Sequence, residues 1–209
     1  MTTTMKIAYY VDARMVPSLA RRYHRLLAPA VRILDVGCGT GDFGRYRLAG
    51  AEVWGVDTDV MALERAERYE IPLVVDLECD DLPFEDGFFD AVLAKDVLEH
   101  LQDPGRVARE LLRVLRPGGK LIASLVVASP RRVWADYTHV RGFTERSARM
   151  LFEDAGFHVD SIWAMGGVPL SARLGFIEVV PSILRVPGLR GLWHSSWELL
   201  ALAPSEDRP

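Results

Sequence analysis

Asp35-Val36-Gly37-Cys38-Gly39-Thr40-Gly41 is the stretch that decides the fold. It ends an apolar run, 31–36, that is typical of a buried strand, and it precedes a helical pattern at 43–49. Glycines let the backbone turn tightly and approach a ligand without a Cβ in the way. The turn therefore predicts a ligand site outside the carboxyl end of the first strand of an open α/β sheet.

Short β-branched runs and helical patterns alternate along the chain after this turn. We expect strands at 31–36, 52–57, 73–76, 89–95, 120–128 and 158–164, and helices at 43–49, 60–68, 104–115 and 144–155. Thr144 and Ser147 are candidate caps of the last helix. Such alternation predicts a doubly wound, mostly parallel sheet with helices on both faces, a Rossmann-like α/β fold.

The chain is expected to form one domain, 1–209, with its core at 31–164. A helix is expected before the core, at 8–27. The tail, 166–209, is interrupted by prolines but holds many large apolar residues, and we expect it to form short helices. A seventh strand is not evident in it: either part of the tail is extended, or helices replace that strand.

Composition excludes several classes of function. The net charge of −4 gives no electrostatic reason to expect a nucleic-acid partner. Two cysteines, Cys38 and Cys79, make no disulfide framework and predict a cytoplasmic protein. The start has no signal-peptide layout, and no apolar run is long enough for a transmembrane segment. Contact of the tail with a membrane surface is an alternative to packing in the core.

The acids around the turn indicate what it binds. Asp57 ends the second strand, where a carboxylate can accept both hydroxyls of a ribose. Gly39, Gly41 and Gly44 also fit the glycine spacing of a dinucleotide site, so an NAD(P)-dependent oxidoreductase is one alternative. Asp35, however, would repel a diphosphate and suits an amino group. A ligand with a ribose and an ammonium, and without a phosphate here, is S-adenosylmethionine.

Beyond the turn, the chain resembles the class I S-adenosylmethionine-dependent methyltransferases over about 31–164. The segments that carry this resemblance are Leu82-Pro83-Phe84, Gly87-Phe88-Phe89-Asp90-Ala91-Val92, Asp96-Val97-Leu98-Glu99-His100-Leu101 and Leu115-Arg116-Pro117-Gly118-Gly119-Lys120-Leu121. The block 136–144 is similar to a segment of bacterial methyltransferases often found with glycan or cell-surface biosynthesis. The resemblance implies a methyltransferase fold, S-adenosyl-L-methionine as cofactor and S-adenosyl-L-homocysteine as product.

The resemblance also implies roles for individual residues. The methionine end of the cofactor would be held by Asp35, Gly37, Cys38, Gly39 and Gly41, the ribose by Asp57, and the adenine by Thr58, Asp76 and Leu77. Glu78 or Asp80 can replace Asp76, because the acid of many relatives sits closer to the Leu-Pro-Phe element. Lys95 and Asp96 would lie beside the sulfur, where Lys95 departs from the small or apolar residue common in the family.

Methyl transfer to a hydroxyl needs a proton acceptor, for which His100 and His139 are the candidates. Each has a structural alternative as a loop anchor. Arg141 would bind an anionic acceptor, or pair with Asp136 or Glu145. Asp96, Glu99 and His100 resemble the acid-x-x-Glu-His arrangement of metal-assisted quinone O-methyltransferases, but the same letters occur in relatives without a metal, and we expect none.

These observations favour an enzyme that methylates a small molecule, at an oxygen of a sugar or a related metabolite. Two alternatives remain: the NAD(P)-dependent oxidoreductase, and a non-catalytic module that keeps the cofactor-binding fold. Lys95, the displaced Asp76 and the missing seventh strand favour the last. The oligomeric state and the acceptor have no readable code in the sequence.

Overall fold

The computed structural model describes residues 16–66, 68–165 and 196–205. Within them, seven strands form one sheet in the order β3-β2-β1-β4-β5-β7-β6. The strands are β1 (Arg32–Val36), β2 (Glu52–Asp57), β3 (Pro72–Val74), β4 (Phe89–Lys95), β5 (Leu115–Val126), β6 (His158–Met165) and β7 (Ser196–Leu202). The first five are parallel, and β7 runs antiparallel between β5 and β6.

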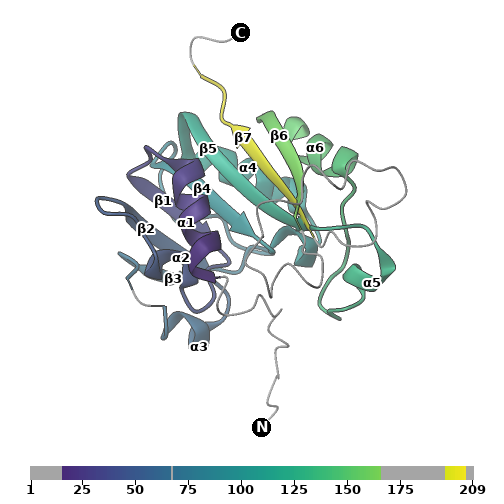
Figure 1. Ribbon diagram of the computed structural model, residues 1–209, viewed down its shortest axis with the longest axis horizontal. Coiled ribbons are helices and arrows are strands. Elements are labelled where there is room, and N and C mark those ends of the chain that lie inside the picture. Colours follow the sequence, from purple (N-terminus) through teal and green to yellow (C-terminus); the bar gives the residue numbers. More distant parts are fainter. Residues whose placement is uncertain (1–15, 67, 166–195, 206–209) are drawn as a thin grey trace.

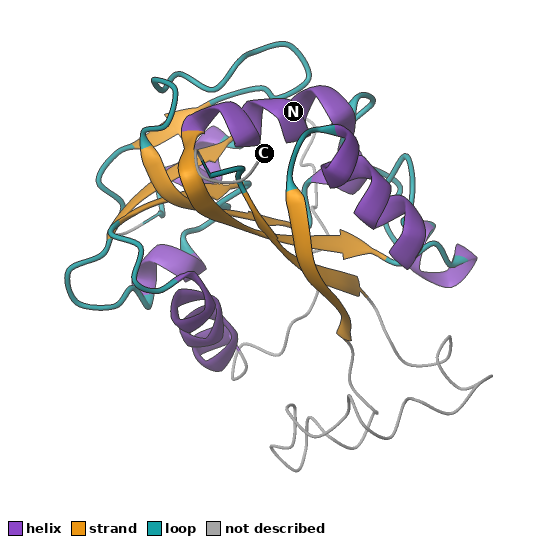
Figure 2. Cartoon of the chain, turned by 90° about the horizontal axis from the view of Figure 1, so that it is seen from above, coloured by secondary structure: helices purple, strands orange, loops and turns teal. Residues whose placement is uncertain are grey.

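The helices are α1 (Val16–Leu27), α2 (Asp42–Arg45), α3 (Val60–Leu63), α4 (Pro104–Val114), α5 (Pro130–Val133) and α6 (Glu145–Asp154), with a 3₁₀ turn, η1 (Leu98–His100). Figure 1 shows α1 in front of the sheet and α4 behind it, and Figure 2 shows helices on both sides of the strands. The doubly wound, mostly parallel arrangement is confirmed.

One element was predicted wrongly. Ser196–Leu202 forms β7, a seventh strand, in a tail that we expected to be helical. The segment pairs along its whole length with β5 on one side and β6 on the other. Leu199 and Ala201 are fully buried there and face the core with alternate spacing. The rest of the predicted tail, 166–195, and residues 8–15 of the predicted first helix lie outside the described residues.

Two helices are also shorter in the structure than the sequence predicted. The helix expected at 43–49 ends at Arg45, and the one expected at 60–68 ends at Leu63. The caps of α6 are as expected: the Thr144 side chain accepts from the Ser147 amide, and the Ser147 hydroxyl accepts from the Thr144 amide. This reciprocal capping box starts α6 at the first residue after Thr144.

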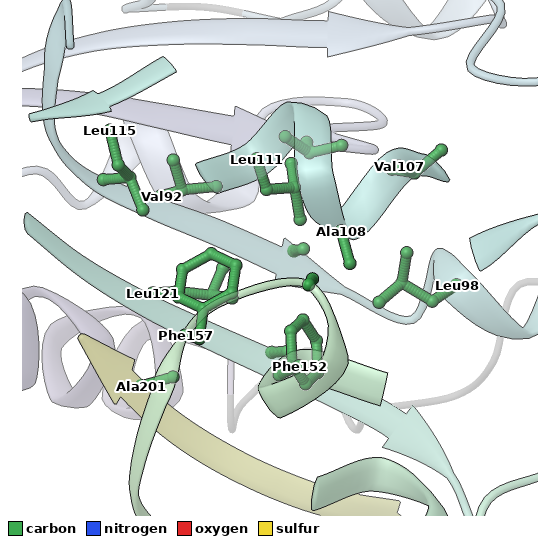
Figure 3. Close-up of a cluster of buried hydrophobic side chains, with 14 of the residues drawn as sticks. Val92, Leu98, Val107, Ala108, Leu111, Leu115, Leu121, Phe152, Phe157 and Ala201 are labelled. Carbon is green, nitrogen blue, oxygen red and sulfur yellow. The ribbon is translucent and has the colours of Figure 1, made fainter. Parts of the chain in front are cut away.

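The two faces of the sheet bury separate apolar cores. One core packs α4 and α6 against alternate residues of the central strands, and Figure 3 shows Leu111 of α4 beside Val92 of β4, with Phe152 of α6 in the same cluster. The other core lies under α1 and α2 and is built around Tyr23, Leu27, Ile33, Phe43, Val53, Ala91, Leu93 and Ile122. The alternation of each strand therefore divides its side chains between the two cores.

Candidate active site

The glycine turn joins β1 to α2 at the carboxyl edge of the sheet. The amides of Gly37 and Cys38 both donate to the Val56 carbonyl, at 2.8 and 3.1 Å, which fixes the turn to β2. Gly39 has φ +52°, and a Cβ added there would meet nothing within 4 Å. At Gly41, φ is +86° and a Cβ would come within 2.9 Å of Ala66 and Tyr69. Gly41 is thus required by packing, whereas Gly39 offers open backbone to a ligand.

Asp35, in the strand just before the turn, is buried and bonded to Tyr69. The Tyr69 hydroxyl donates to the Asp35 carboxylate at 2.5 Å and accepts from the Gly44 amide at 3.1 Å. Burial raises the pKa of Asp35 to about 7, although the Tyr69 bond and the charge of Lys95 lower it. Asp35 is therefore a carboxyl group that a cationic ligand would help to ionise.

Tyr69 was missed by the sequence analysis. Its ring lies against Gly41, Gly44 and Gly55, where an added Cβ would approach it to 2.9 Å or less. Nothing in the stretch Glu70-Ile71-Pro72 that follows it signals this role, because the contact depends on how the chain returns from α3 to β3. The Cys38 side chain is also buried on this side, next to Gly55, so only the backbone of Cys38 faces the turn's ligand side.

Asp57 connects the end of β2 to the glycine turn. One carboxylate oxygen accepts from the Gly39 amide at 2.9 Å, and the other accepts from the Asp59 amide at 2.8 Å. Thr58, next in the chain, is exposed. Since an ionised carboxylate has about four acceptor positions, each oxygen of Asp57 keeps one for a further donor.

The segment after β3 carries the residues that the resemblance places near adenine. Leu77 is buried in the core, and Asp76 is exposed and accepts from the Glu78 amide at 3.0 Å. The two alternative acids hold the loop itself: Glu78 accepts from the Gln102 amide at 2.8 Å, and Asp80 accepts from the Asp76 amide at 3.1 Å. Asp76 is thus less engaged in fixing other segments than Glu78 is.

Lys95 and Asp96 lie where β4 ends, and they form an ion pair. The Ser124 hydroxyl donates to the other Asp96 oxygen at 2.9 Å, and Asp96 has φ +54°, a left-handed conformation uncommon for a residue with a Cβ. Burial alone would lower the pKa of Lys95, but the charges of Asp96, Glu99 and Glu198 raise it overall. The acids around Lys95, a residue unusual for the family at this position, thus offset the cost of burying its charge.

Strand register extends this group into a polar row across four strands. Lys95 on β4 is level with Ser124 on β5, Ser124 with Glu198 on β7, and Glu198 with Trp163 on β6. Glu198 is 2% exposed and accepts from Arg22 at 2.9 Å, Tyr23 at 2.6 Å and the Trp163 indole at 2.8 Å. It therefore fixes α1 to the sheet beside Lys95 and Asp96.

Glu198 was also missed by the sequence analysis. A signal was present, because Trp197, Leu199 and Ala201 alternate with Glu198 and Leu200 in the two-residue period of a strand. An acid in the middle of such a run indicates a buried partner on another element.

The two candidate histidines lie side by side next to Glu99. The ring centroids of His100 and His139 are 4.7 Å apart. His100 Nδ1 contacts the Thr138 hydroxyl at 3.0 Å, and His139, which is buried, bonds through Nδ1 to the Val133 carbonyl at 3.0 Å. Burial raises the pKa of Glu99 to about 8, and the nearby Asp96 charge adds to this rise. The structure thus brings His100 and His139 together, from η1 and from the loop after α5.

Arg141 has neither of the acidic partners that we considered for it. Its Nη2 donates to the Gln102 carbonyl at 2.8 Å, and its Nε is buried without a hydrogen-bond partner among the described residues. Asp136 instead accepts from the backbone and hydroxyl of Thr138, at 2.9 and 2.6 Å. Arg141 therefore holds the loop between α5 and α6, which carries His139, against the segment after η1.

The residues at the turn fit S-adenosylmethionine better than a dinucleotide. Open backbone at Gly39 and a carboxylate at Asp57 suit a nucleoside, and the buried Asp35 suits a positively charged amino group but opposes a diphosphate. When bound, this cofactor supplies a methyl group on a positively charged sulfur.

Comparison with known proteins agrees with this fit. Residues 34–123 match the family described as a methyltransferase domain. The chain is 37% identical to 27-O-demethylrifamycin SV methyltransferase of Amycolatopsis mediterranei (strain S699), over 53% of this chain and 44% of that protein. It is 31% identical to phosphoethanolamine N-methyltransferase 1 of Arabidopsis thaliana, over 63% of this chain and 29% of that protein. The chain spans about half or less of the length of the curated relatives it matches.

Among solved structures, an S-adenosylmethionine-dependent methyltransferase from Mesorhizobium loti has the same fold, with a TM-score of 0.68, 20% sequence identity and coverage of 90% of this chain and 99% of that one. No helix in the described part of the chain is long and apolar enough to cross a membrane. Residues 34–123 of this chain therefore match a methyltransferase domain, and the sheet of the described residues has the fold of a solved S-adenosylmethionine-dependent methyltransferase.

Proposed function

We propose that this protein transfers a methyl group from S-adenosylmethionine to an oxygen of a small molecule, a sugar or a related metabolite. The observation that carries the choice of oxygen is the group of two histidines and Glu99 next to Lys95 and Asp96. A hydroxyl must lose a proton as it is methylated, and this group places proton-accepting side chains beside the end of β4. The similarity of 136–144 to methyltransferases of glycan biosynthesis supports a sugar.

The cofactor contacts form the first part of the proposal. Asp35 would pair with the amino group, the turn from Gly37 to Gly41 would hold the methionine end, and Asp57 would accept from the ribose hydroxyls. Thr58, Asp76 and Leu77 would surround the adenine. The support is the open backbone at Gly39 and the acceptor positions left on Asp57.

The chemistry requires placement more than reactive side chains. In the transfer, the acceptor oxygen bonds to the methyl carbon, the carbon–sulfur bond breaks, and its electron pair stays on sulfur. Lys95 and Asp96 at the end of β4 would orient the acceptor, and the hydroxyl proton would go to the Glu99–His100–His139 group. Holding the two reactants in line, away from water, favours the transition state.

The partner implied is a small-molecule acceptor, with no nucleic acid. The free thiols of Cys38 and Cys79 are the basis for proposing the cytoplasm as the location. The proposed membrane contact of the tail falls mainly on 166–195, outside the described residues.

The test is transfer of a radiolabelled methyl group from S-adenosylmethionine to a panel of sugars, hydroxylated metabolites and amines. We expect labelling of hydroxyl compounds, and a large fall in kcat with little change in KM for the cofactor in His100→Ala. Labelling of amines alone, at a rate unaffected by His100→Ala, would contradict an oxygen acceptor. Binding of the cofactor without transfer to any compound of the panel would favour the non-catalytic alternative.

A further inference from the structure

The Glu99–His100–His139 group converges from two segments of the chain. One ligating atom of each residue lies within 4.8 Å of the others. Glu99 and His100 belong to η1, and His139 belongs to the loop between α5 and α6. The Val140 amide donates to the Glu99 carbonyl at 2.9 Å, which fixes one segment against the other.

The hydrogen bonds of both rings select the same tautomer. A carbonyl oxygen only accepts, so His139 Nδ1 must donate to Val133, and in the neutral ring Nε2 carries the lone pair. The Thr138 hydroxyl donates a hydrogen bond to Asp136 at 2.6 Å, so its oxygen must accept the hydrogen bond from His100 Nδ1. In the neutral form, both imidazoles therefore carry the lone pair that can ligate an ion on Nε2. A backbone carbonyl or a hydrogen-bonded side chain behind Nδ1 is the arrangement found behind metal-binding histidines.

Glu99 supplies an independent observation. Its side chain is 1% exposed, and its Oε2 has no hydrogen-bond partner among the described residues. A buried carboxyl oxygen without a hydrogen-bond partner is destabilising, so such an oxygen calls for a ligand. Asp96, the acid named in the sequence alternative for a metal, is instead engaged by Lys95 and Ser124.

We propose that Glu99, His100 and His139 form a binding site for a divalent first-row transition-metal ion such as Zn²⁺. Two imidazoles and one carboxylate suit zinc, iron or nickel, whereas Mg²⁺ prefers oxygen ligands alone. Three protein ligands leave a coordination position open, as in catalytic zinc sites.

This site deepens the proposed O-methylation and rests on it for its role. An acceptor hydroxyl at the open position would lose its proton more readily, because a bound cation lowers the pKa of a coordinated hydroxyl. The proton leaves to solvent, and the oxygen is left to form its bond to the methyl carbon. With the ion bound, both imidazoles are ligands, so the ion takes over from the ring nitrogens of the proposed function the task of promoting loss of the hydroxyl proton.

The test is calorimetric titration of Zn²⁺, and separately of Mg²⁺, into chelator-treated full-length protein without affinity-tag histidines. We expect one Zn²⁺ per chain and no Mg²⁺ binding. Glu99→Gln, His100→Ala and His139→Ala should each weaken Zn²⁺ binding at least about tenfold, since each removes a ligand. His158→Ala removes an exposed histidine of β6 and should bind Zn²⁺ like the wild type.

A second readout keeps the test independent of folding and of the proposed function. Each variant is titrated with S-adenosylhomocysteine, which should bind unchanged if only the metal site is lost. Zn²⁺ binding that survives all three substitutions, or no Zn²⁺ binding by the wild type, would overturn the metal site. Full-rate hydroxyl methylation by zinc-free protein would overturn the ion's role and leave O-methylation standing.

Discussion

Asp35 lies beneath the glycine turn, 4% exposed, with the Tyr69 hydroxyl donating to it. Burial raises the free energy of the ionised carboxylate in this position, and a nearby cation would lower it. The cofactor's amino group would supply the missing charge. Asp35 is therefore expected to lower the stability of the cofactor-free protein and to raise the affinity for the cofactor.

The first prediction follows from the pKa of Asp35, which burial raises from 3.8 to about 7. Between these values the folded protein holds a proton that the unfolded chain has released, so the free energy of unfolding falls as pH rises through this window. Asp35→Asn removes the titration. Its melting temperature relative to wild type should therefore be lowest near pH 4 and rise until above pH 7, while S-adenosylhomocysteine binding weakens. Melting curves that differ by the same amount at every pH would contradict this account of Asp35.

Glu198 gives the second prediction. Its two oxygens accept from Arg22, Tyr23 and Trp163, so an amide nitrogen in place of one oxygen would face a donor. Glu198→Gln should lower the free energy of unfolding by roughly 2–4 kcal/mol, discounted for the partial exposure of Arg22. Urea denaturation measures it. Glu153→Gln, which removes an exposed i,i+4 pair with Arg149, is the matched control and should cost roughly 0.5 kcal/mol or less.

At the scale of elements, β7 holds the sheet's far edge to its centre. Leu199, fully buried, is level with Ala123 on β5 and with Ile162 on β6. Leu199→Ala should lower the free energy of unfolding by about 2–5 kcal/mol through the cavity it leaves. Leu48→Ala, at a residue 41% exposed, should cost much less. Equal, small effects in urea denaturation would mean that β7 is not part of the core.

The same strand shows where sequence reasoning stops. Glu198, Leu199, Leu200 and Ala201 are good helix formers, so local propensity points away from a strand. The position between β5 and β6 provides hydrogen-bond partners on both sides, and tertiary pairing overrides the propensity. The five parallel strands were predictable because apolar runs alternate with helical patterns and turn residues, although β5 begins at Leu115, before its predicted start at residue 120.

The same contrast holds within the site. Gly39 and Asp57 could be predicted from their residue types and their positions after strand ends. In the structure, the Gly39 amide donates to the Asp57 carboxylate at 2.9 Å. Tyr69 has no such signal, because it reaches Asp35 only after the chain has crossed to another element. Glu198 has a signal in the alternation around it, but its partners on α1 and β6 follow only from the fold. Lys95 departs from the family pattern, and the charges of Asp96, Glu99 and Glu198 favour its charged form in spite of its burial.

At the scale of the whole molecule, the sheet order gathers residues from distant parts of the chain at one edge. Asp35 and Asp57 come from β1 and β2, Lys95 and Asp96 from the end of β4, and the histidine group from η1 and the loop after α5. The carboxyl ends of parallel strands meet at the same edge, where open α/β sheets bind their ligands. The cofactor and acceptor sites are therefore expected to be neighbours.

The most direct test of this account is calorimetric titration of S-adenosylhomocysteine into wild type and Asp57→Ala, with Asp160→Asn, an exposed residue of β6, as control. We expect one site with a micromolar Kd in wild type and control. Asp57→Ala should bind about tenfold or more weakly, because hydrogen bonds to a charged group contribute about 1.5–3 kcal/mol. No binding by wild type, or equal binding by wild type and Asp57→Ala, would contradict the assignment of the glycine turn and Asp57 to the cofactor.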